Sequence, residues 1–369
     1  MPLKYRPDID GLRAIAVLAM TLLCGVLSFS SAPCFAFVST PSRIAPASPS
    51  MPDTVLIRIN AVIPNDAFSQ CQIGHAYAEG RVFLRDYAMA LRFYRMAAGQ
   101  GYAPAQYAIG WLYDSGNGVL QNPKQAAEWY RLAAEQGVEE AQFNLANLYY
   151  NGLGVKQSYE DARLWYTRAA KKGMAEAQLN LALLYNAEGG NSRNPQQALK
   201  WFRLAAEQGE PQAQYNIGAM YALGDGVQQN DTTAVKWFTL AAKQGKVLAE
   251  YHLAIAFYHG KGVAQDYAQS FIWMGKAAEQ GHTSAQHNVA VAYEHGQGTA
   301  MDFNKAFYWY KKAADAGLAS SQFNLGLMYV KGRGVAKDLT KAKELFRQAC
   351  ENGLPNGCEA YKDMESRGY

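Results

Sequence analysis

The stretch AQFNLANLYYNGLGVKQSYEDARLWYTRAAKKGMAE, residues 141–176, decides how the rest of the chain is read. Its apolar residues return at helical spacing in two runs, 141–149 and 162–170, and Asn-Gly-Leu-Gly lies between the runs. This pattern predicts two amphipathic helices joined by a glycine turn. The pattern recurs along the chain with a period of 36 residues, so the stretch is one unit of an array.

Eight such units follow one another without an insertion or deletion. They begin at Ser69, Ala105, Ala141, Ala177, Ala213, Ala249, Ala285 and Ser321, and the last ends at Asn356. When each unit is numbered from 1 to 36, position 9 is Tyr in seven units, position 25 is Trp in six, and positions 29 and 33 are always Ala and Gly. Large and small residues therefore hold fixed places, as close packing between neighbouring helices requires.

The connection inside each unit also has a pattern. Gly-x-Gly-Val, as at Gly152 to Val155, permits the left-handed backbone that ends a helix. Position 18 offers side chains suited to capping the second helix, namely Asn122, Asn194, Asn230, Asp266, Asp302 and Asp338. Two units depart from the pattern, because Glu188 and Asn191 replace the loop Gly and Val and because Val82 replaces a Gly. We expect those two loops to be reshaped.

Read as Ala-Gln-x-Asn-Leu-Gly-x-x-Tyr, Gly-x-Gly-Val, Ala-x-x-Trp-Tyr and Ala-Ala-x-x-Gly, the unit closely resembles the Sel-one-like repeat (SLR) family, a relative of the tetratricopeptide repeats. The resemblance covers residues 69–356. It implies an all-α fold, a right-handed superhelical α/α solenoid in which each unit contacts mainly the next. Residues 357–369 begin a ninth unit and end in polar residues, so we expect a C-terminal capping helix there.

The beginning of the sequence has the composition of an export signal. Basic residues precede an apolar run at 14–27, and small residues follow up to Ala36. This predicts that residues 1–36 are a signal peptide, cleaved after Ala36, or else an uncleaved membrane anchor. The protein is then periplasmic or secreted, or anchored in the inner membrane and facing the periplasm, and any membrane association runs through this segment alone.

The segment from Tyr5 to Leu18 also resembles the start of the first membrane helix in a family of multi-spanning membrane acyltransferases. No further apolar spans of about 20 residues follow, so no activity is implied by this resemblance. Residues 37–68 are rich in Pro and Ser, which favours an extended linker.

Two of the three cysteines after the leader suggest a bridge. Cys350 replaces the Ala of most other units, and Cys358 lies in the expected capping helix. An oxidising compartment would favour a disulfide between them, and cysteine-rich members of the resembled family bridge consecutive helices in a similar manner. The alternative is a pair of buried thiols. Cys71 is left without a partner cysteine.

Positions that vary while their neighbours stay fixed are the best candidates for binding. Similarity to tetratricopeptide arrays places positions 3, 7, 10 and 11 of the first helix on a concave groove. The candidate residues of this partner-binding groove are Tyr107, Trp111, Asp114, Phe143, Tyr150, Tyr215, Tyr251, Tyr258, Glu294 and Phe323. Exposed aromatic residues are typical interface anchors. The alternative is that these rings only pack along the superhelix.

Other features favour structural roles. The tryptophans at position 25 are expected in the core, and the asparagines that recur at position 4 are read as a ladder between units in preference to a grip on a peptide backbone. His252, His259, His287 and His295 lie in adjacent units but lack the i, i+4 spacing of a helical zinc site, so no metal is predicted. No catalytic motif or cofactor signature is present. The 35 basic and 31 acidic residues are mixed, which gives nucleic-acid binding no support.

The sequence therefore predicts a bacterial protein that is not an enzyme. It would be an interaction scaffold or adaptor of the cell envelope, or a secreted one, that binds a peptide or protein in its concave groove, with a role in signalling, envelope assembly or host contact. The alternative is a penicillin-binding, weakly β-lactamase-like or peptidoglycan-related activity, as described for cysteine-rich family members. That alternative ranks lower because the sequence lacks Ser-x-x-Lys with its companion motifs.

Overall fold

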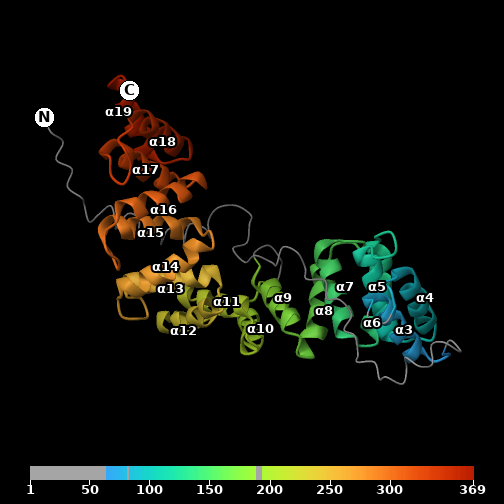
Figure 1. Ribbon diagram of the computed structural model, residues 1–369. Coiled ribbons are helices and arrows are strands. Elements are labelled where there is room, and N and C mark those ends of the chain that lie inside the picture. Colours follow the sequence, from blue (N-terminus) through green and yellow to red (C-terminus); the bar gives the residue numbers. More distant parts are fainter. Residues whose placement is uncertain (1–63, 81–82, 188–192) are drawn as a thin grey trace. The chain divides into compact units, whose positions relative to one another are not determined.

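The computed structural model describes residues 64–80, 83–187 and 193–369. These residues form seventeen α helices and no strand, which confirms the predicted all-α array of helical hairpins (Figure 1). The predicted leader and most of the linker lie outside the described residues. None of the described helices is long and apolar enough to cross a membrane.

The protein divides into two compact units, residues 1–194 and 195–369, and each is described by itself. The first unit contains α3 (Ala67–Glu79), α4 (Tyr87–Gly99), α5 (Ala103–Ser115), α6 (Pro123–Glu135), α7 (Glu139–Asn151), α8 (Tyr159–Lys171) and α9 (Ala175–Asn186). The second contains α10 (Pro195–Glu207), α11 (Pro211–Leu223), α12 (Asp231–Lys243), α13 (Val247–His259), α14 (Tyr267–Glu279), α15 (Thr283–His295), α16 (Phe303–Asp315), α17 (Ala319–Lys331), α18 (Leu339–Glu351) and α19 (Pro355–Ser366).

The two helices of a repeat pack through a large residue set against a small one. Tyr130, at position 26 in α6, is fully buried against Gly110, at position 6 in α5. A Cβ atom at Gly110 would lie 2.6 Å from Cδ1 of Tyr130, so the glycine is what allows the ring this close. Gly74, Gly218 and Gly326 stand in the same relation to the position-26 rings of their own repeats. The repeated sequence thus sets the spacing of the two helices.

Neighbouring repeats are joined by a buried amide. The Nε2 group of Gln142, at position 2, donates to the carbonyl oxygen of Ala134 in the preceding repeat at 3.0 Å. The same bond to the preceding repeat is made by Gln178, Gln214, Gln286 and Gln322. Because these carbonyls lie in the last turns of second helices, the bond satisfies groups that a helix end leaves unpaired. We call this contact the glutamine link.

The tryptophans and tyrosines of the repeat pack as predicted. Trp165 and Trp201 are buried, and the other position-25 tryptophans are half-buried. The position-9 tyrosines use their hydroxyls at the edge of the core, where Tyr113 accepts from Arg95 at 2.8 Å. Tyr149 and Tyr221 accept from Arg131 and Arg203 of the preceding repeat in the same way.

Residues at position 18 cap the second helices, as the sequence predicts. Asn122 accepts from the Gln125 amide at 3.1 Å, and Asn230, Asp266, Asp302 and Asp338 cap their helices in the same manner. Asp86 and Ser158 act as further caps. Gly152 ends α7 with a φ of 68°, a left-handed conformation that favours glycine. The loop replacements at Val82, Glu188 and Asn191 lie outside the described residues.

Helix α19 packs against the last repeat. A disulfide joins Cys350 in α18 to Cys358 in α19, and Met364 packs against Ala342 and Phe346. Residues 359, 362, 363 and 365 are exposed and charged, so the outer face of α19 is polar. Cys71, in α3, is a free cysteine, and burial raises the pKa of its thiol to about 12.

Candidate functional site

The aromatic residues at position 3 do not form an open surface in most repeats. Tyr107, Phe143 and Tyr215 are 3%, 1% and 9% exposed. Each ring packs on the position-26 ring of its own repeat, with centroid distances of 5.7 Å for Tyr107–Tyr130, 5.8 Å for Phe143–Tyr166 and 5.8 Å for Tyr215–Phe238. The prediction that these three side chains are exposed is wrong, because they fill the space between the helices of a repeat.

Asp114 is also buried, with 2% of its surface exposed, so its predicted place on an open groove is wrong as well. Its Oδ2 accepts from the Tyr130 hydroxyl at 3.4 Å. Among the position-4 asparagines, Asn144 and Asn180 are buried and donate to Tyr107 and Tyr166 of the preceding repeat, each at 3.4 Å. Asn324 donates to Tyr310 at 3.2 Å, which completes a structural ladder of the predicted kind.

Six of the predicted groove residues are half-buried, which leaves part of each side chain open. They are Trp111 and Tyr150 in the first unit, and Tyr251, Tyr258, Glu294 and Phe323 in the second. Tyr251 stacks on His282 at 4.4 Å, and Phe323 packs against Phe346 at 5.5 Å. Glu294 accepts from the Tyr310 hydroxyl at 2.9 Å and lies 3.9 Å from Arg333, so its carboxylate is held in place.

Two of these residues belong to a repeated arrangement, which we call the aromatic pairs. Tyr150 packs at 5.3 Å against Tyr159, the first residue of α8, and Tyr258 packs at 5.2 Å against Tyr267, the first residue of α14. A glutamine fixes each pair. Gln157 Nε2 donates to the Tyr150 carbonyl at 2.9 Å and to the Tyr159 hydroxyl at 3.2 Å, and Gln265 makes the matching bonds at 2.8 and 3.0 Å.

The aromatic pairs combine an open apolar face with neutral hydroxyls. Tyr159 and Tyr267 are 48% and 41% exposed. Burial raises the pKa of Tyr150 to about 12 and also raises the pKa of Tyr258, and the neighbouring tyrosine of each pair acts in the same direction. These hydroxyls therefore stay protonated at neutral pH. Rings of this kind, rigidly held and partly open, are suited to contact with another protein.

Sequence reasoning missed Tyr159 and Tyr267. Both occupy position 19, at the start of the second helix, where four other repeats have Pro, Asp or Leu. The available signal was the joint occurrence of Tyr at positions 10 and 19 with Gln at position 17 in the same two repeats. That combination is invisible when each position is compared along the array by itself.

Two of the four predicted histidines, His252 and His287, pack against core residues. His252 stacks on Phe238 at 5.4 Å, and His287 bonds Ser321 Oγ at 2.8 Å. Burial lowers the pKa of both imidazoles to about 4. Across the described residues, no group of three or more His, Cys, Asp or Glu side chains is arranged to hold a metal ion.

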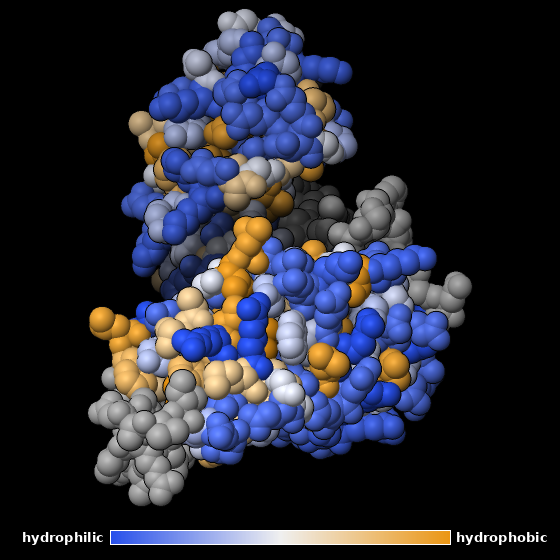
Figure 2. Space-filling view, turned by 90° about the vertical axis from the view of Figure 1, so that its right-hand side faces the viewer, coloured by the Kyte–Doolittle hydropathy of each residue, from blue (hydrophilic) through white to orange (hydrophobic). Residues whose placement is uncertain are grey.

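The face shown in Figure 2 is mainly hydrophilic. On the face shown in Figure 2, hydrophobic residues form separate small groups among hydrophilic ones. Exposed apolar side chains include Leu84 and Leu120, both at position 16 in the first unit.

Comparisons with known proteins agree with the fold. The protective antigen c5321 of uropathogenic Escherichia coli, which displays an SLR fold, is 34% identical with a TM-score of 0.80, and the match covers 85% of this protein and 67% of that one. A Sel1 repeat protein from Oxalobacter formigenes is 33% identical with a TM-score of 0.65, over 81% of this protein and 87% of that one. No curated protein matches the sequence.

The Sel1 repeat matches the sequence eight times in succession. The matched segments are residues 67–102, 103–138, 139–174, 175–210, 211–246, 247–282, 283–318 and 319–354. They begin two residues before the units read from the sequence, at or close to the starts of the first helices, and they keep the period of 36. Proteins built from this repeat are protein-interaction scaffolds, and on the strength of eight unbroken matches this protein belongs to the Sel1 repeat family.

Proposed function

We propose that this protein is a non-enzymatic adaptor that binds a peptide or another protein through the first helices of its repeats and the starts of the second helices. The observation that carries the proposal is the occurrence of two matching aromatic pairs, Tyr150 with Tyr159 and Tyr258 with Tyr267. Each pair is rigid, half open and made by residues that the core of the repeat does not require. Further half-buried side chains of the predicted groove are Trp111 in the first unit and Tyr251 and Glu294 in the second.

We further propose that the adaptor works outside the cytoplasm, in the cell envelope or as a secreted protein. The Cys350–Cys358 disulfide supports this location, because such bridges persist in oxidising compartments. One relative is a protective antigen of a uropathogenic bacterium, which supports a role at the boundary between cell and host. The leader predicted at residues 1–36 would supply export or an anchor.

Site-specific photo-crosslinking in cells tests the binding surface. A benzophenone group is placed at Tyr159 or Tyr267, and at Tyr308 as a control, since Tyr308 is 50% exposed but belongs to neither pair. We expect a discrete adduct from the first two sites and none of the same mass from the control. Changing Tyr150 or Tyr258 to Ala should remove the adduct of its own pair, because the partner ring loses its support. The same adduct from Tyr308 would contradict the assignment.

Fluorescent penicillin separates the adaptor from the alternative activity. A penicillin-binding enzyme forms a covalent ester with an active-site serine, whereas an adaptor does not. We expect no labelled band from the purified protein. A labelled serine would refute the non-enzymatic function while leaving the repeat fold intact.

A further inference from the structure

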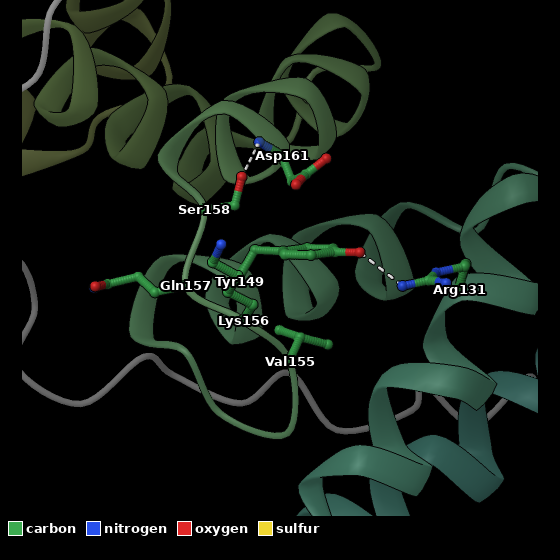
Figure 3. Close-up of a pocket in the computed structure, with 7 residues that line it drawn as sticks. All are labelled: Arg131, Tyr149, Val155, Lys156, Gln157, Ser158 and Asp161. Atoms are coloured by element: carbon green, nitrogen blue, oxygen red, sulfur yellow. Dashed lines mark hydrogen bonds between the residues drawn. The ribbon is translucent and has the colours of Figure 1, made fainter.

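One pocket lies in the first unit between the second and third repeats, beside the Tyr150–Tyr159 pair. It has a volume of about 530 Å³ and is lined by Arg131, Tyr149, Val155, Lys156, Gln157, Ser158 and Asp161 (Figure 3). These residues come from α6, α7, the loop after α7 and the start of α8. They hold repeat positions 9, 15 to 18, 21 and 27, none of which belongs to the predicted groove. The pocket therefore adjoins the first aromatic pair through Gln157, although neither ring of the pair lines it.

The cations of the pocket are available to a ligand. Arg131 donates to the Tyr149 hydroxyl at 2.6 Å, and the two side chains point toward each other in Figure 3. Within the described part of the protein, Arg131 and Lys156 form no ion pair with a carboxylate. A guanidinium has five N–H groups, so the bond to Tyr149 fixes its orientation and leaves the others for a second acceptor.

The remaining lining limits the charge that the pocket can accept. Arg131 and Lys156 carry two positive charges and Asp161 carries one negative charge, a balance of one positive charge. In the view of Figure 3, Asp161 and Ser158 lie on one side of the Tyr149 ring and Val155 and Lys156 on the other. Ser158 is already used, because it caps α8 by accepting from the Asp161 amide. A single carboxylate suits this arrangement better than a multiply charged anion such as phosphate.

The other repeats show that this combination is not part of the packing. The same Arg–Tyr bond joins Arg95 to Tyr113 and Arg203 to Tyr221, each at 2.8 Å. At those places position 16 is Leu120 or Gln228, and position 21 is Gln125 or Thr233. The bond alone therefore serves to tie adjacent repeats, and Lys156 with Asp161 is an addition to it.

We propose that the pocket between α6 and α8 binds a carboxylate of an acidic partner peptide. The guanidinium of Arg131, oriented by Tyr149, and the ammonium of Lys156 are the two cations that bind it. The carboxylate comes from an Asp or Glu residue or from the C-terminus of the peptide, since both present the same two oxygens. Arginine binds such a group through two parallel N–H···O bonds, and the charge makes these bonds stronger than neutral ones. The two cations of the site are not part of the aromatic pairs, whereas Gln157 belongs to both.

Three short peptides titrated into the folded protein test the site. They are acetyl-Ala-Glu-amide, whose carboxylate belongs to Glu, acetyl-Ala-Ala with a free C-terminus, and neutral acetyl-Ala-Gln-amide. The amide resonances of residues 156–158 report binding by nuclear magnetic resonance. We expect saturable shifts with one or both acidic peptides and none with the neutral one, and the peptide that binds identifies the source of the carboxylate. Equal shifts with all three peptides, or tighter binding of inorganic phosphate, would overturn the proposal.

Matched variants separate binding from folding. Arg131→Gln should lower the affinity for the acidic peptide at least tenfold, and Lys156→Ala should lower it about threefold to tenfold. This is the range expected for one or two charge-assisted hydrogen bonds in partly exposed surroundings. Arg95→Gln removes the same tie one repeat earlier and should leave the affinity unchanged. If Arg95→Gln lowers the peptide affinity as much as Arg131→Gln does, the Arg–Tyr bond has only a structural role and the pocket is not a binding site. Thermal unfolding of both variants verifies that they lose similar stability.

Discussion

His287 shows how burial in the core of this array affects a titratable side chain. It is 4% exposed, and its ring packs edge-on against Tyr310 with centroids 5.5 Å apart. Its Nδ1 meets Ser321 Oγ at 2.8 Å, while its Nε2 is buried and has no hydrogen-bond partner among the described residues. A proton added to this ring would place a charge in a dry environment, and burial therefore lowers the pKa of His287 to about 4.

Acid should destabilise the second unit through this residue. The pKa is about 4 in the folded state against 6.5 when unfolded, so the contribution to stability is complete above pH 6.5 and is lost as the pH falls toward 4. We expect His287 alone to cost about 3 kcal/mol between pH 7 and pH 4. His287→Phe, which places the residue found at position 3 in two other repeats, should flatten the pH dependence of urea unfolding. An unchanged pH dependence would show that another group dominates.

The position-3 residues also show where sequence reasoning stops. Helical spacing correctly placed Tyr107, Phe143 and Tyr215 on one side of the first helix. Whether that side meets a partner or the neighbouring helix depends on how closely the two helices approach. That approach is set by Gly at position 6 in some repeats and Ala in others, a distance that no periodicity reveals. The repeat could be predicted in full, and the exposure of individual rings could not.

At the level of the helices, the second helix of a repeat is stabilised by the side chain of its N-cap residue. Asn122 Oδ1 accepts from the Gln125 amide at 3.1 Å and so satisfies one of the donors that the first turn of α6 leaves unpaired. The type of residue at position 18 made these caps predictable, because few side chains are short enough and polar enough to reach the backbone amide.

Removing such a cap should lower the free energy of unfolding, and a replacement that keeps an acceptor oxygen should restore it. Asn122→Ala should lower the free energy of unfolding by about 1 kcal/mol, since the amide of Gln125 loses its acceptor. Asn122→Asp keeps an acceptor oxygen and serves as the control. Chemical denaturation of the two variants and the parent protein provides the comparison, and equal losses for Ala and Asp would argue against a capping role.

Helix α19 depends on a covalent tie as well as on packing. The bridge from Cys350 to Cys358 closes a short loop, and Met364 supplies the main buried contact of the helix. The bridge could be anticipated because Cys350 replaces an Ala that recurs along the array, although a pair of buried thiols was an open alternative.

Reduction should therefore loosen the end of the array before the rest. For a loop of this length the chain-entropy estimate is about 2 to 3 kcal/mol. We expect dithiothreitol, or Cys358→Ser, to speed hydrogen exchange in α19 and α18 with little change in α5 to α8. Cys71→Ala is the control, because that buried thiol takes no part in the bridge. Equal exchange with and without reductant would mean that packing alone holds the helix.

For the molecule as a whole, stability is local because each repeat contacts mainly its neighbours. Repeats communicate through shared side chains and the glutamine link, so a defect weakens the nearest repeats most. Each of the two compact units also has its own buried core. A substitution in one unit should therefore leave the distant helices of the other unchanged.

A core substitution near one end tests this locality. Phe346, at position 26 of the last repeat, is 2% exposed, and Phe346→Ala should cost about 3 to 5 kcal/mol. Hydrogen exchange should rise in α17 to α19 and stay unchanged in α5 to α8. Tyr130→Ala, the same position in the second repeat, should give the reverse pattern. Uniform acceleration along the array in either variant would show that it unfolds as one cooperative body.

The glutamine link has a consequence for the gene. Five joints between repeats use a Gln at the same position and spacing, so removing or duplicating 36 consecutive residues between such joints regenerates an ordinary joint at the seam. A shift of one residue would instead turn the Gln, the capping residue and the terminal Gly away from their partners. Recombination between repeats that are in register can therefore lengthen or shorten this protein, and natural selection can adjust its reach in steps of one whole hairpin.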